Sequence, residues 1–121
     1  MKVSKNNKIG VVLINFNSSD FTEACIKSLY KSSWSQYHIY VVDNNSKQID
    51  QQKIRKLEKK YRNKISFIYN KYNLGFAGGN NLGIKAALAD GCEYIWLLNN
   101  DTEINDLSME LYLKFFKKKW Y

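Results

Sequence analysis

The sequence alternates four times between segments typical of buried strands and segments typical of amphipathic helices. The strand-like segments are apolar and rich in β-branched residues, and they comprise residues 9–16, 38–42, 65–69 and 94–98. Apolar residues at helical spacing mark the other segments, which comprise residues 20–32, 49–61, 84–89 and 105–119. This order predicts an α/β fold, with a mostly parallel sheet covered by helices on both faces. Because no linker or repeat interrupts the pattern, we interpret residues 1–121 as a single domain.

Polar side chains follow three of the four strands at the point where each strand ends. They are Asn15 and Asn17, Asp43 and Asn44, and the run Asn99-Asn100-Asp101. Parallel strands end at one edge of a sheet, and ligands bind just beyond that edge, so these side chains are predicted to form one site. The alternative is that each cluster is only a polar turn that caps the next helix, because Asn, Asp and Thr favour turns and N-caps.

The end of the fourth strand carries the clearest of these signals. The run Tyr94–Leu98 is apolar throughout, which predicts a strand buried on both faces, and Asn99–Glu103 follows it at once. A carboxylate such as Asp101 suits a hard divalent cation, and that cation suits a phosphate-bearing ligand. The sequence therefore predicts a nucleotide site built around Asp101.

Four of the six glycines lie between Gly75 and Gly83, in a segment that runs into the third helix. Dense glycine allows the backbone to approach a ligand closely, and a helix N-terminus attracts phosphate. The spacing fits neither the dinucleotide fingerprint nor the P-loop, which requires lysine where Ile84 stands. The segment is interpreted either as a phosphate contact or as a tight strand-to-helix turn with close helix packing.

The net charge of +8, from 19 basic and 11 acidic residues, favours an anionic partner. Two lysine-rich blocks, at residues 53–64 and 114–119, are interpreted as solvated helix faces, with a nucleic-acid or membrane surface as the alternative. Cys25 and Cys92 lack metal-ligand spacing and His38 is the single histidine, which argues against zinc sites and against Cys-His or Ser-His-Asp catalysis. No apolar run approaches the roughly 20 residues of a membrane span, so we expect a cytoplasmic protein.

Three motifs follow one another along the chain. They are Val42-Asp43-Asn44-Asn45-Ser46, then Asn73-Leu74-Gly75-Phe76-Ala77-Gly78-Gly79-Asn80-Asn81-Leu82-Gly83, and then Leu97-Leu98-Asn99-Asn100-Asp101-Thr102. In this order they resemble the family 2 glycosyltransferases, most of all the rhamnosyltransferase-like branch that builds surface polysaccharides, over residues 8–110. The resemblance implies a GT-A fold, a Rossmann-like sheet that binds a nucleotide-diphosphate sugar with Mg²⁺ or Mn²⁺. The likeness favours a UDP- or dTDP-sugar.

The resemblance also implies roles for individual residues. Asn15 and Asn17 would line the nucleotide pocket, and Asp43 would contact the base or the ribose. The run Asn99-Asn100-Asp101 occupies the place of the family's D-x-D motif, in which Asp101 would coordinate the metal. Asn99 replaces the first aspartate, and one carboxylate with substrate phosphates can hold Mg²⁺. The other expected donor contacts are Asn44, Gly75, Gly78, Gly79 and Asn80. Asn80 stands near the place where many relatives have an arginine.

Members of this family perform inverting sugar transfer, in which an acceptor hydroxyl attacks the anomeric carbon and a carboxylate base takes its proton. Their base and acceptor site lie in the second half of the protein, so the general base is expected beyond Tyr121. We therefore expect the donor-binding half of a truncated GT-A enzyme, with a glycan or lipid-linked acceptor and no nucleic-acid partner. It would work in the cytoplasm, at the inner face of the membrane. A non-catalytic nucleotide-sugar-binding module is the alternative, and apolar surface left open by the missing half predicts a homo-oligomer.

Overall fold

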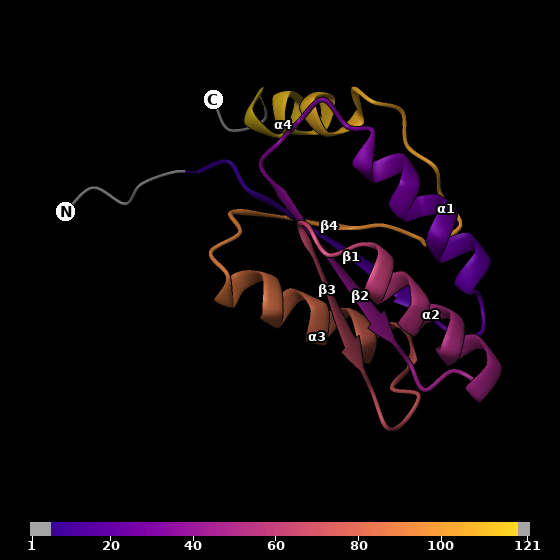
Figure 1. The fold of residues 1–121 in the computed structure, drawn as a ribbon. Helices are drawn as coiled ribbons and strands as arrows, with labels where there is room; N and C mark the ends of the chain where they lie inside the picture. Colours follow the sequence, from indigo (N-terminus) through magenta and orange to yellow (C-terminus); the bar gives the residue numbers. More distant parts are fainter. Residues whose placement is uncertain (1–5, 119–121) are drawn as a thin grey trace.

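The computed structural model describes residues 6–118, which form a four-stranded sheet with helices on both faces (Figure 1). The strands are β1 (Ile9–Asn15), β2 (Tyr37–Asp43), β3 (Ile65–Tyr69) and β4 (Tyr94–Leu97). The helices are α1 (Ser19–Tyr30), α2 (Gln48–Lys60), α3 (Gly75–Ala89) and α4 (Ser108–Lys118). All neighbouring strands are parallel, in the order β3-β2-β1-β4. The predicted α/β fold is confirmed.

The two faces of the sheet carry separate apolar cores, because successive side chains of a strand point to opposite faces. Val11 and Leu13 of β1 pack against α1, α2 and α4. Val12, between them, packs with Tyr40 beneath α3. Figure 1 shows α3 on the opposite side of the sheet from α1 and α2. The helices therefore sandwich the sheet.

The glycine-dense segment forms the first half of α3 and is not a loop that precedes the helix. Small residues let this helix lie close to the sheet. A Cβ at Gly79 would lie 3.0 Å from Ile14 Cδ1, and a Cβ at Gly83 would overlap Val12 Cγ1. Close helix packing, one of the two predicted roles of this segment, is confirmed.

The prediction that Tyr94–Leu98 is buried on both faces is wrong, because the side chains of β4 are only partly buried or exposed. Within the described residues, β4 pairs with β1 and with no other strand. Leu97 is 45% exposed, and Trp96 is only partly buried. An apolar run indicates burial, but it carries no information about strand order, and strand order decides whether the outer edge is covered.

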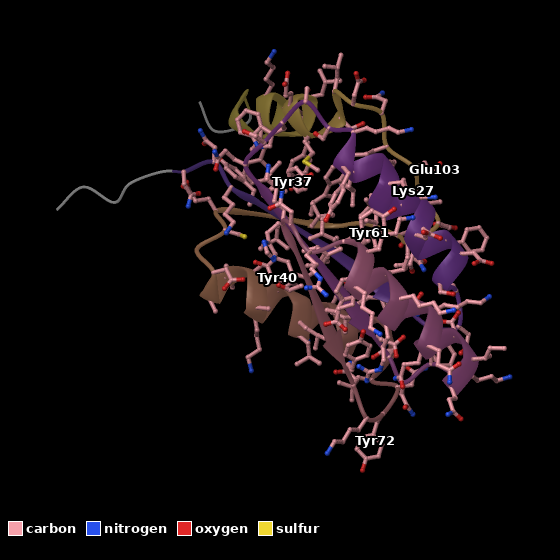
Figure 2. The ribbon with its side chains drawn as sticks, in the orientation of Figure 1. Lys27, Tyr37, Tyr40, Tyr61, Tyr72 and Glu103 are labelled. Atoms are coloured by element: carbon pink, nitrogen blue, oxygen red, sulfur yellow. The ribbon has the colours of Figure 1, made fainter. Side chains whose placement is uncertain are left out.

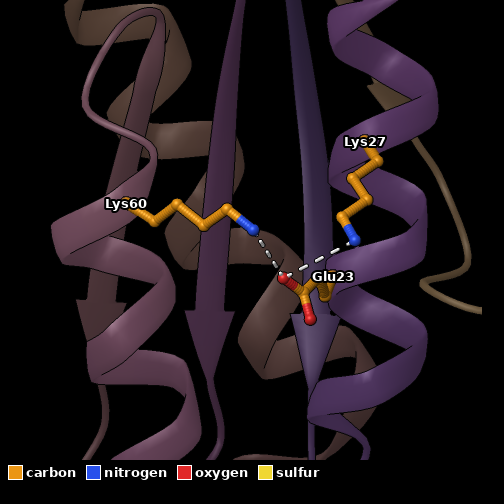
Figure 3. Close-up of polar contacts among 3 residues, drawn as sticks. All are labelled: Glu23, Lys27 and Lys60. Atoms are coloured by element: carbon orange, nitrogen blue, oxygen red, sulfur yellow. Dashed lines mark hydrogen bonds and ion pairs between the residues drawn. The ribbon is translucent and has the colours of Figure 1, made fainter.

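Glu23 links α1 to α2 at the surface. Its carboxylate lies 3.4 Å from Lys60 Nζ of α2 and 4.0 Å from Lys27 Nζ of α1 (Figure 3). Such exposed ion pairs contribute little, because water screens them. The packing of the two helices therefore rests on apolar residues beneath them, including Ile26 and Ile54, which are fully buried.

An exposed apolar row runs from the residue before α4 along the outward face of that helix. Met109 and Leu113 turn toward the core, whereas Leu107, Leu111 and Phe115 are each at least half exposed. The helical spacing of these three residues is as the sequence predicts, but the face that they share is the outer one. Among the described segments, none is a helix of the length and apolarity required to cross a membrane.

Candidate functional site

A pocket of about 350 Å³ opens at the carboxyl ends of β1 and β4. The run that follows β4 forms its polar wall, with Asn99, Asn100 and Asp101. Three exposed aromatic residues also line it, namely Phe16, Phe21 and Phe76. The rest of the lining comes from Ile14, Ser18 and Leu98. A carboxylate and aromatic rings thus meet at the edge where parallel α/β sheets bind their ligands.

Asn15 is the centre of a buried hydrogen-bond network at the end of β1. Its Nδ2 donates to Asp43 Oδ1 at 2.9 Å and to Asp50 Oδ2 at 3.0 Å. Its Oδ1 accepts from Thr22 Oγ1 at 2.6 Å, and the side chain is fully buried. This one amide therefore ties the ends of β1 and β2 to the beginnings of α1 and α2.

Asp43, the last residue of β2, is enclosed by the loop that follows it and leads to α2. Its Oδ1 accepts from Ser46 Oγ at 2.6 Å as well as from Asn15, and its Oδ2 accepts from Gln51 Nε2 at 3.1 Å. The side chain is 1% exposed and is not among the residues that line the pocket. In this arrangement Asp43 holds the loop after β2, and its contact with a base or ribose stays a prediction.

Asp50 belongs to the same network, although sequence analysis did not identify it. Its Oδ1 accepts from the backbone N–H of Ser19, the first residue of α1, at 3.0 Å. Burial raises the pKa of Asp50, but hydrogen bonds from Ser19, Asn15 and Ser46 outweigh burial and leave the pKa below its usual value. The sequence holds no signal for this contact, because Asp50 and Ser19 lie on different helices and only the fold brings them together.

Asn17 and Asn44 connect loops and do not line the pocket. Asn17 adopts a φ of +52°, and its Oδ1 accepts from the backbone N–H of Lys47 at 2.7 Å. Asn44 is buried; its Nδ2 donates to the Gly75 carbonyl at 2.9 Å, and its Oδ1 accepts from Asn70 Nδ2 at 2.9 Å. Both side chains position the loops around the site, and a direct ligand contact by either stays a prediction.

The predicted glycine contacts lie in the first two turns of α3. Gly75 begins the helix with a φ of +73°, a conformation that glycine adopts readily. Gly78 lies so near the Leu74 side chain that an added Cβ would be 2.8 Å from Leu74 Cβ. Gly79 packs against the sheet, and none of the three lines the pocket. Their contacts with phosphate stay predictions.

Asn80 carries a buried amide group without a partner. The side chain is 5% exposed, and its Nδ2 makes no hydrogen bond to any described residue. Asn80 lies four residues after Phe76 on α3, so the two share a face of the helix, and Phe76 lines the pocket. Asn80 itself does not line the pocket. Because buried donors are nearly always paired in folded proteins, its contact with a ligand stays a prediction.

The loop after β4 is anchored at its middle residue. Asn100 Nδ2 donates to Ser18 Oγ at 2.7 Å and to Thr22 Oγ1 at 3.0 Å. Its neighbours Asn99 and Asp101 remain exposed at the pocket. The alternative interpretation, that this run caps the next helix, is wrong because α4 begins only at Ser108.

The aromatic residues are the part of the pocket that sequence analysis missed. The sequence predicts Phe16 in the first strand and Phe21 in the apolar spacing of the first helix, yet both side chains are exposed. A signal was present at Phe16, since an aromatic residue flanked by Asn15 and Asn17 at a strand end is poorly placed for the core. No comparable signal marked Phe76, which lies inside the glycine-dense segment.

Residues 10–121 match the family model described as Glycosyl transferase family 2. The chain belongs to this family. The resemblance expected from the three motifs is therefore confirmed, and no curated protein matches the sequence.

Solved structures share the fold of this family 2 chain. TarS from S. aureus in complex with UDP-GlcNAc has 23% identity and a TM-score of 0.76, over 92% of this chain and 31% of TarS. TarS in complex with UDP has 22% identity and a TM-score of 0.74, over 92% of this chain and 32% of that one. The mannosyltransferase PcManGT from Pyrobaculum calidifontis, in complex with GDP-Man and Mn²⁺, has 15% identity and a TM-score of 0.71, over 88% of this chain and 31% of that enzyme. These likenesses confirm the GT-A fold, and the chain spans about a third of each relative.

The acidic residues near the pocket suit a metal ion that arrives with its ligand. Within residues 6–118, no three His, Cys, Asp or Glu side chains are grouped closely enough to form a metal cage. Asp101 offers one exposed carboxylate, whereas Glu103 lines a different surface pocket together with Lys27 of α1 (Figure 2). One carboxylate is sufficient for Mg²⁺ or Mn²⁺ when phosphate oxygens complete the coordination shell.

Cys25 lies in the core near this acidic loop. Burial, with smaller effects from the charges of Glu103 and Asp101, raises the pKa of its thiol to about 12. The thiol therefore stays protonated at neutral pH and cannot act as a nucleophile. Cys25 is a free thiol that is fully buried in the core.

Proposed function

We propose that this chain binds a nucleotide-diphosphate sugar in the pocket at the ends of β1 and β4, as the donor-binding part of a glycosyltransferase. The observation that carries the proposal is the exposed carboxylate of Asp101 beside the exposed rings of Phe16 and Phe76. A carboxylate suits a metal-bound diphosphate, and aromatic faces suit a nucleobase. The ligands of the solved relatives, which are UDP-GlcNAc, UDP and GDP-Man, support the same ligand class.

The base that we propose is uracil or thymine, carried as a UDP- or dTDP-sugar. Asn80 Nδ2 is a buried donor without a partner, on the helix face that it shares with Phe76. A carbonyl oxygen of a pyrimidine could accept its hydrogen bond, and this would satisfy a group whose isolation destabilises the unliganded protein. In this arrangement Phe76 would contact the base and Asn80 would bind its edge.

Metal dependence and inversion belong to the same proposal. Bound Mg²⁺ or Mn²⁺ would neutralise the charge that develops on the departing diphosphate. Asp101 would hold the ion, and Asn100 would fix the loop that carries Asp101 through its hydrogen bonds to Ser18 and Thr22. Among the described residues, Asp101 is the one carboxylate that lines the pocket, and it is assigned to the metal ion. We therefore propose that the general base, which takes the proton of the acceptor hydroxyl, lies beyond Tyr121.

The acceptor and the location rest on the family resemblance. We propose transfer of rhamnose or a similar sugar to a glycan or lipid-linked acceptor in surface polysaccharide synthesis, in the cytoplasm at the inner face of the membrane. An exposed apolar row supports peripheral contact with a membrane or with a second copy of the chain. It is formed by Leu107, just before α4, and by Leu111 and Phe115 of α4.

The experiment that tests the metal role compares Asp101→Asn with Glu103→Gln, which removes the same charge outside the pocket. The melting temperature of each protein is measured with UDP, with and without Mn²⁺. Ligand at a hundred times its Kd adds about 2.7 kcal/mol, which is a readily measured shift. We expect Mn²⁺ to increase the shift in the original protein and in Glu103→Gln, and to add nothing in Asp101→Asn. An equal Mn²⁺ effect in all three proteins would contradict the role of Asp101.

A further inference from the structure

A second groove lies at the other edge of the sheet from the donor pocket. It has a volume of about 500 Å³ and runs between β3 and α2, lined by Ile65 and Phe67 of β3 and by Arg55 and Lys59 of α2 among others. None of its lining residues belongs to the donor pocket. We call it the β3–α2 groove. It therefore requires an explanation of its own.

The outer side of β3 presents unpaired backbone groups to this groove. Ile39 N–H donates to the Lys64 carbonyl at 2.8 Å, and Asn70 N–H donates to the Asp43 carbonyl at 2.9 Å. The backbone N–H and C=O groups of successive residues in a strand point to opposite sides. In β3 those of the even-numbered residues point to β2, so those of Ile65, Phe67 and Tyr69 point outward. Within the described part of the chain, β3 pairs with β2 alone, so this edge is open to another strand.

The side of the groove formed by α2 and its end is basic. Arg55, Lys59 and Arg62 line it and are all exposed. Glu58 is its one acidic lining residue among those described, and its Oε1 accepts from the Tyr69 hydroxyl at 2.8 Å. The apolar side chains of Ile65 and Phe67 form its floor. The groove thus combines an open strand edge with an excess of positive charge.

We propose that the β3–α2 groove binds an extended acidic polypeptide segment, which adds to β3 as a further strand. Main-chain hydrogen bonds to the open edge would supply affinity, and acidic side chains facing Arg55, Lys59 and Arg62 would supply specificity. This surface is separate from the donor pocket, so the proposal does not depend on sugar transfer.

Two other occupants fit the groove less well. Single-stranded nucleic acid binds largely by stacking its bases on exposed aromatic faces. Of the aromatic residues that line the groove, Tyr61 is 9% exposed, and Phe67 is partly buried and packs against the core. A second copy that paired edge to edge through β3 would bring two sets of basic side chains together, which is unfavourable. An acidic peptide matches both the backbone pattern and the charge.

The test uses fluorescence anisotropy with a labelled peptide of four Glu-Thr repeats, at physiological salt. Alternation places every Glu on one face of the added strand. We expect the peptide to bind, and the triple variant Arg55→Glu, Lys59→Glu, Arg62→Glu to bind it about tenfold more weakly or worse. The matched control changes three exposed lysines outside the groove by the same total charge, as Lys71→Glu, Lys85→Glu and Lys114→Glu, and is expected to keep most of the affinity.

A second peptide, N-methylated at alternate residues, separates strand addition from charge attraction. The methylated peptide keeps all the carboxylates but cannot donate the main-chain hydrogen bonds to β3. We therefore expect the original protein to bind the methylated peptide no more tightly than the triple variant binds the unmethylated one. Equal binding of the methylated and unmethylated peptides would overturn the proposal, and so would an equal loss in the control triple variant. Tighter binding of oligo-deoxythymidine through the same three basic residues, or self-association that these residues control without peptide binding, would also overturn it. Nucleotide binding by the triple variant is measured in parallel and is expected to be unchanged.

Discussion

At the scale of single residues, Asn80 links stability to ligand binding. Its Nδ2 is buried without a partner, which costs the unliganded protein about 1–3 kcal/mol. We expect Asn80→Leu, which has similar volume and no polar group, to raise the free energy of unfolding and to weaken nucleotide binding. Urea unfolding and nucleotide titration measure the two effects. Asn81→Ala, an exposed neighbour on α3, should leave nucleotide affinity unchanged.

The combination of results decides this prediction. Lower stability of Asn80→Leu together with unchanged nucleotide affinity would mean that the amide is structural. That outcome would remove Asn80 from the site.

His38 gives the fold a dependence on pH. Burial and the charge of Lys8 lower the pKa of the imidazole, with a smaller opposing effect from Asp90. In the unfolded chain His38 binds a proton near its usual pKa of about 6.5, whereas in the folded protein it binds one only at lower pH. Stability is expected to be constant above that pH and to decrease as the pH falls below it.

His38→Gln provides the control, because glutamine can replace the contact of His38 Nε2 with Ser66 Oγ, which is 2.8 Å long, but does not titrate. Urea unfolding between about pH 7.5 and pH 5.5 lies above the range in which carboxylates titrate. We expect the original protein to lose stability over this interval and the variant to lose less. Identical slopes would contradict the assignment to His38.

Individual site residues could be predicted only in part. The composition of the strand ends was sufficient to place Asn99, Asn100 and Asp101 at a pocket. It could not distinguish a side chain that lines the pocket from one that holds a loop, as Asp43 does, because that difference depends on partners distant in sequence. The place of Phe76 at the pocket was not predictable either, because its exposure depends on how α3 packs against the sheet.

At the scale of elements, the contact between α3 and β1 determines where one wall of the pocket lies. A Cβ at Gly83 would overlap Val12 Cγ1, so we expect Gly83→Ala to force α3 and the Val12 side chain apart. Alanine favours the helix by about 1 kcal/mol over glycine, whereas overpacking costs about 1–3 kcal/mol. We expect a net loss of about 1 kcal/mol in urea unfolding, with weaker nucleotide binding because Phe76 moves with α3.

Asn81→Ala is the matched control, since it adds an alanine to an exposed position of the same helix. It should change stability by a few tenths of a kcal/mol and in the favourable direction. A Gly83→Ala protein as stable as the original would mean that α3 does not depend on this close approach.

The number and type of the elements were predictable, but their spatial order was not. Hydrophobic periodicity is local, and it identified all four strands and four helices. Strand order depends on which segments pair, so periodicity placed Tyr94–Leu98 in the sheet without indicating that β4 lies at its edge. The sequence predicts that the glycine-dense segment precedes the third helix, whereas the structure places it inside α3. Glycine is a poor helix former, and the close packing of this segment against β1 overrides that preference.

At the scale of the whole molecule, the sheet carries two separate surfaces. The proposed donor pocket lies at the carboxyl ends of β1 and β4, and the β3–α2 groove lies along the other edge strand. Net charge predicted an anionic partner but not its place, because the chain has basic residues on many surfaces. The fold places the exposed carboxylate Asp101 at one surface and Arg55, Lys59 and Arg62 at the other.

Calorimetric titration of this chain with UDP and with dTDP, each with and without Mn²⁺, tests the central claim most directly. We predict that one of the two nucleotides binds, and that its affinity rises when Mn²⁺ is present because Asp101 and the diphosphate share the ion. The nucleotide that binds more tightly would identify the nucleotide part of the donor. Absence of binding by either nucleotide, to a chain that circular dichroism finds folded, would contradict the claim that this pocket is a donor site.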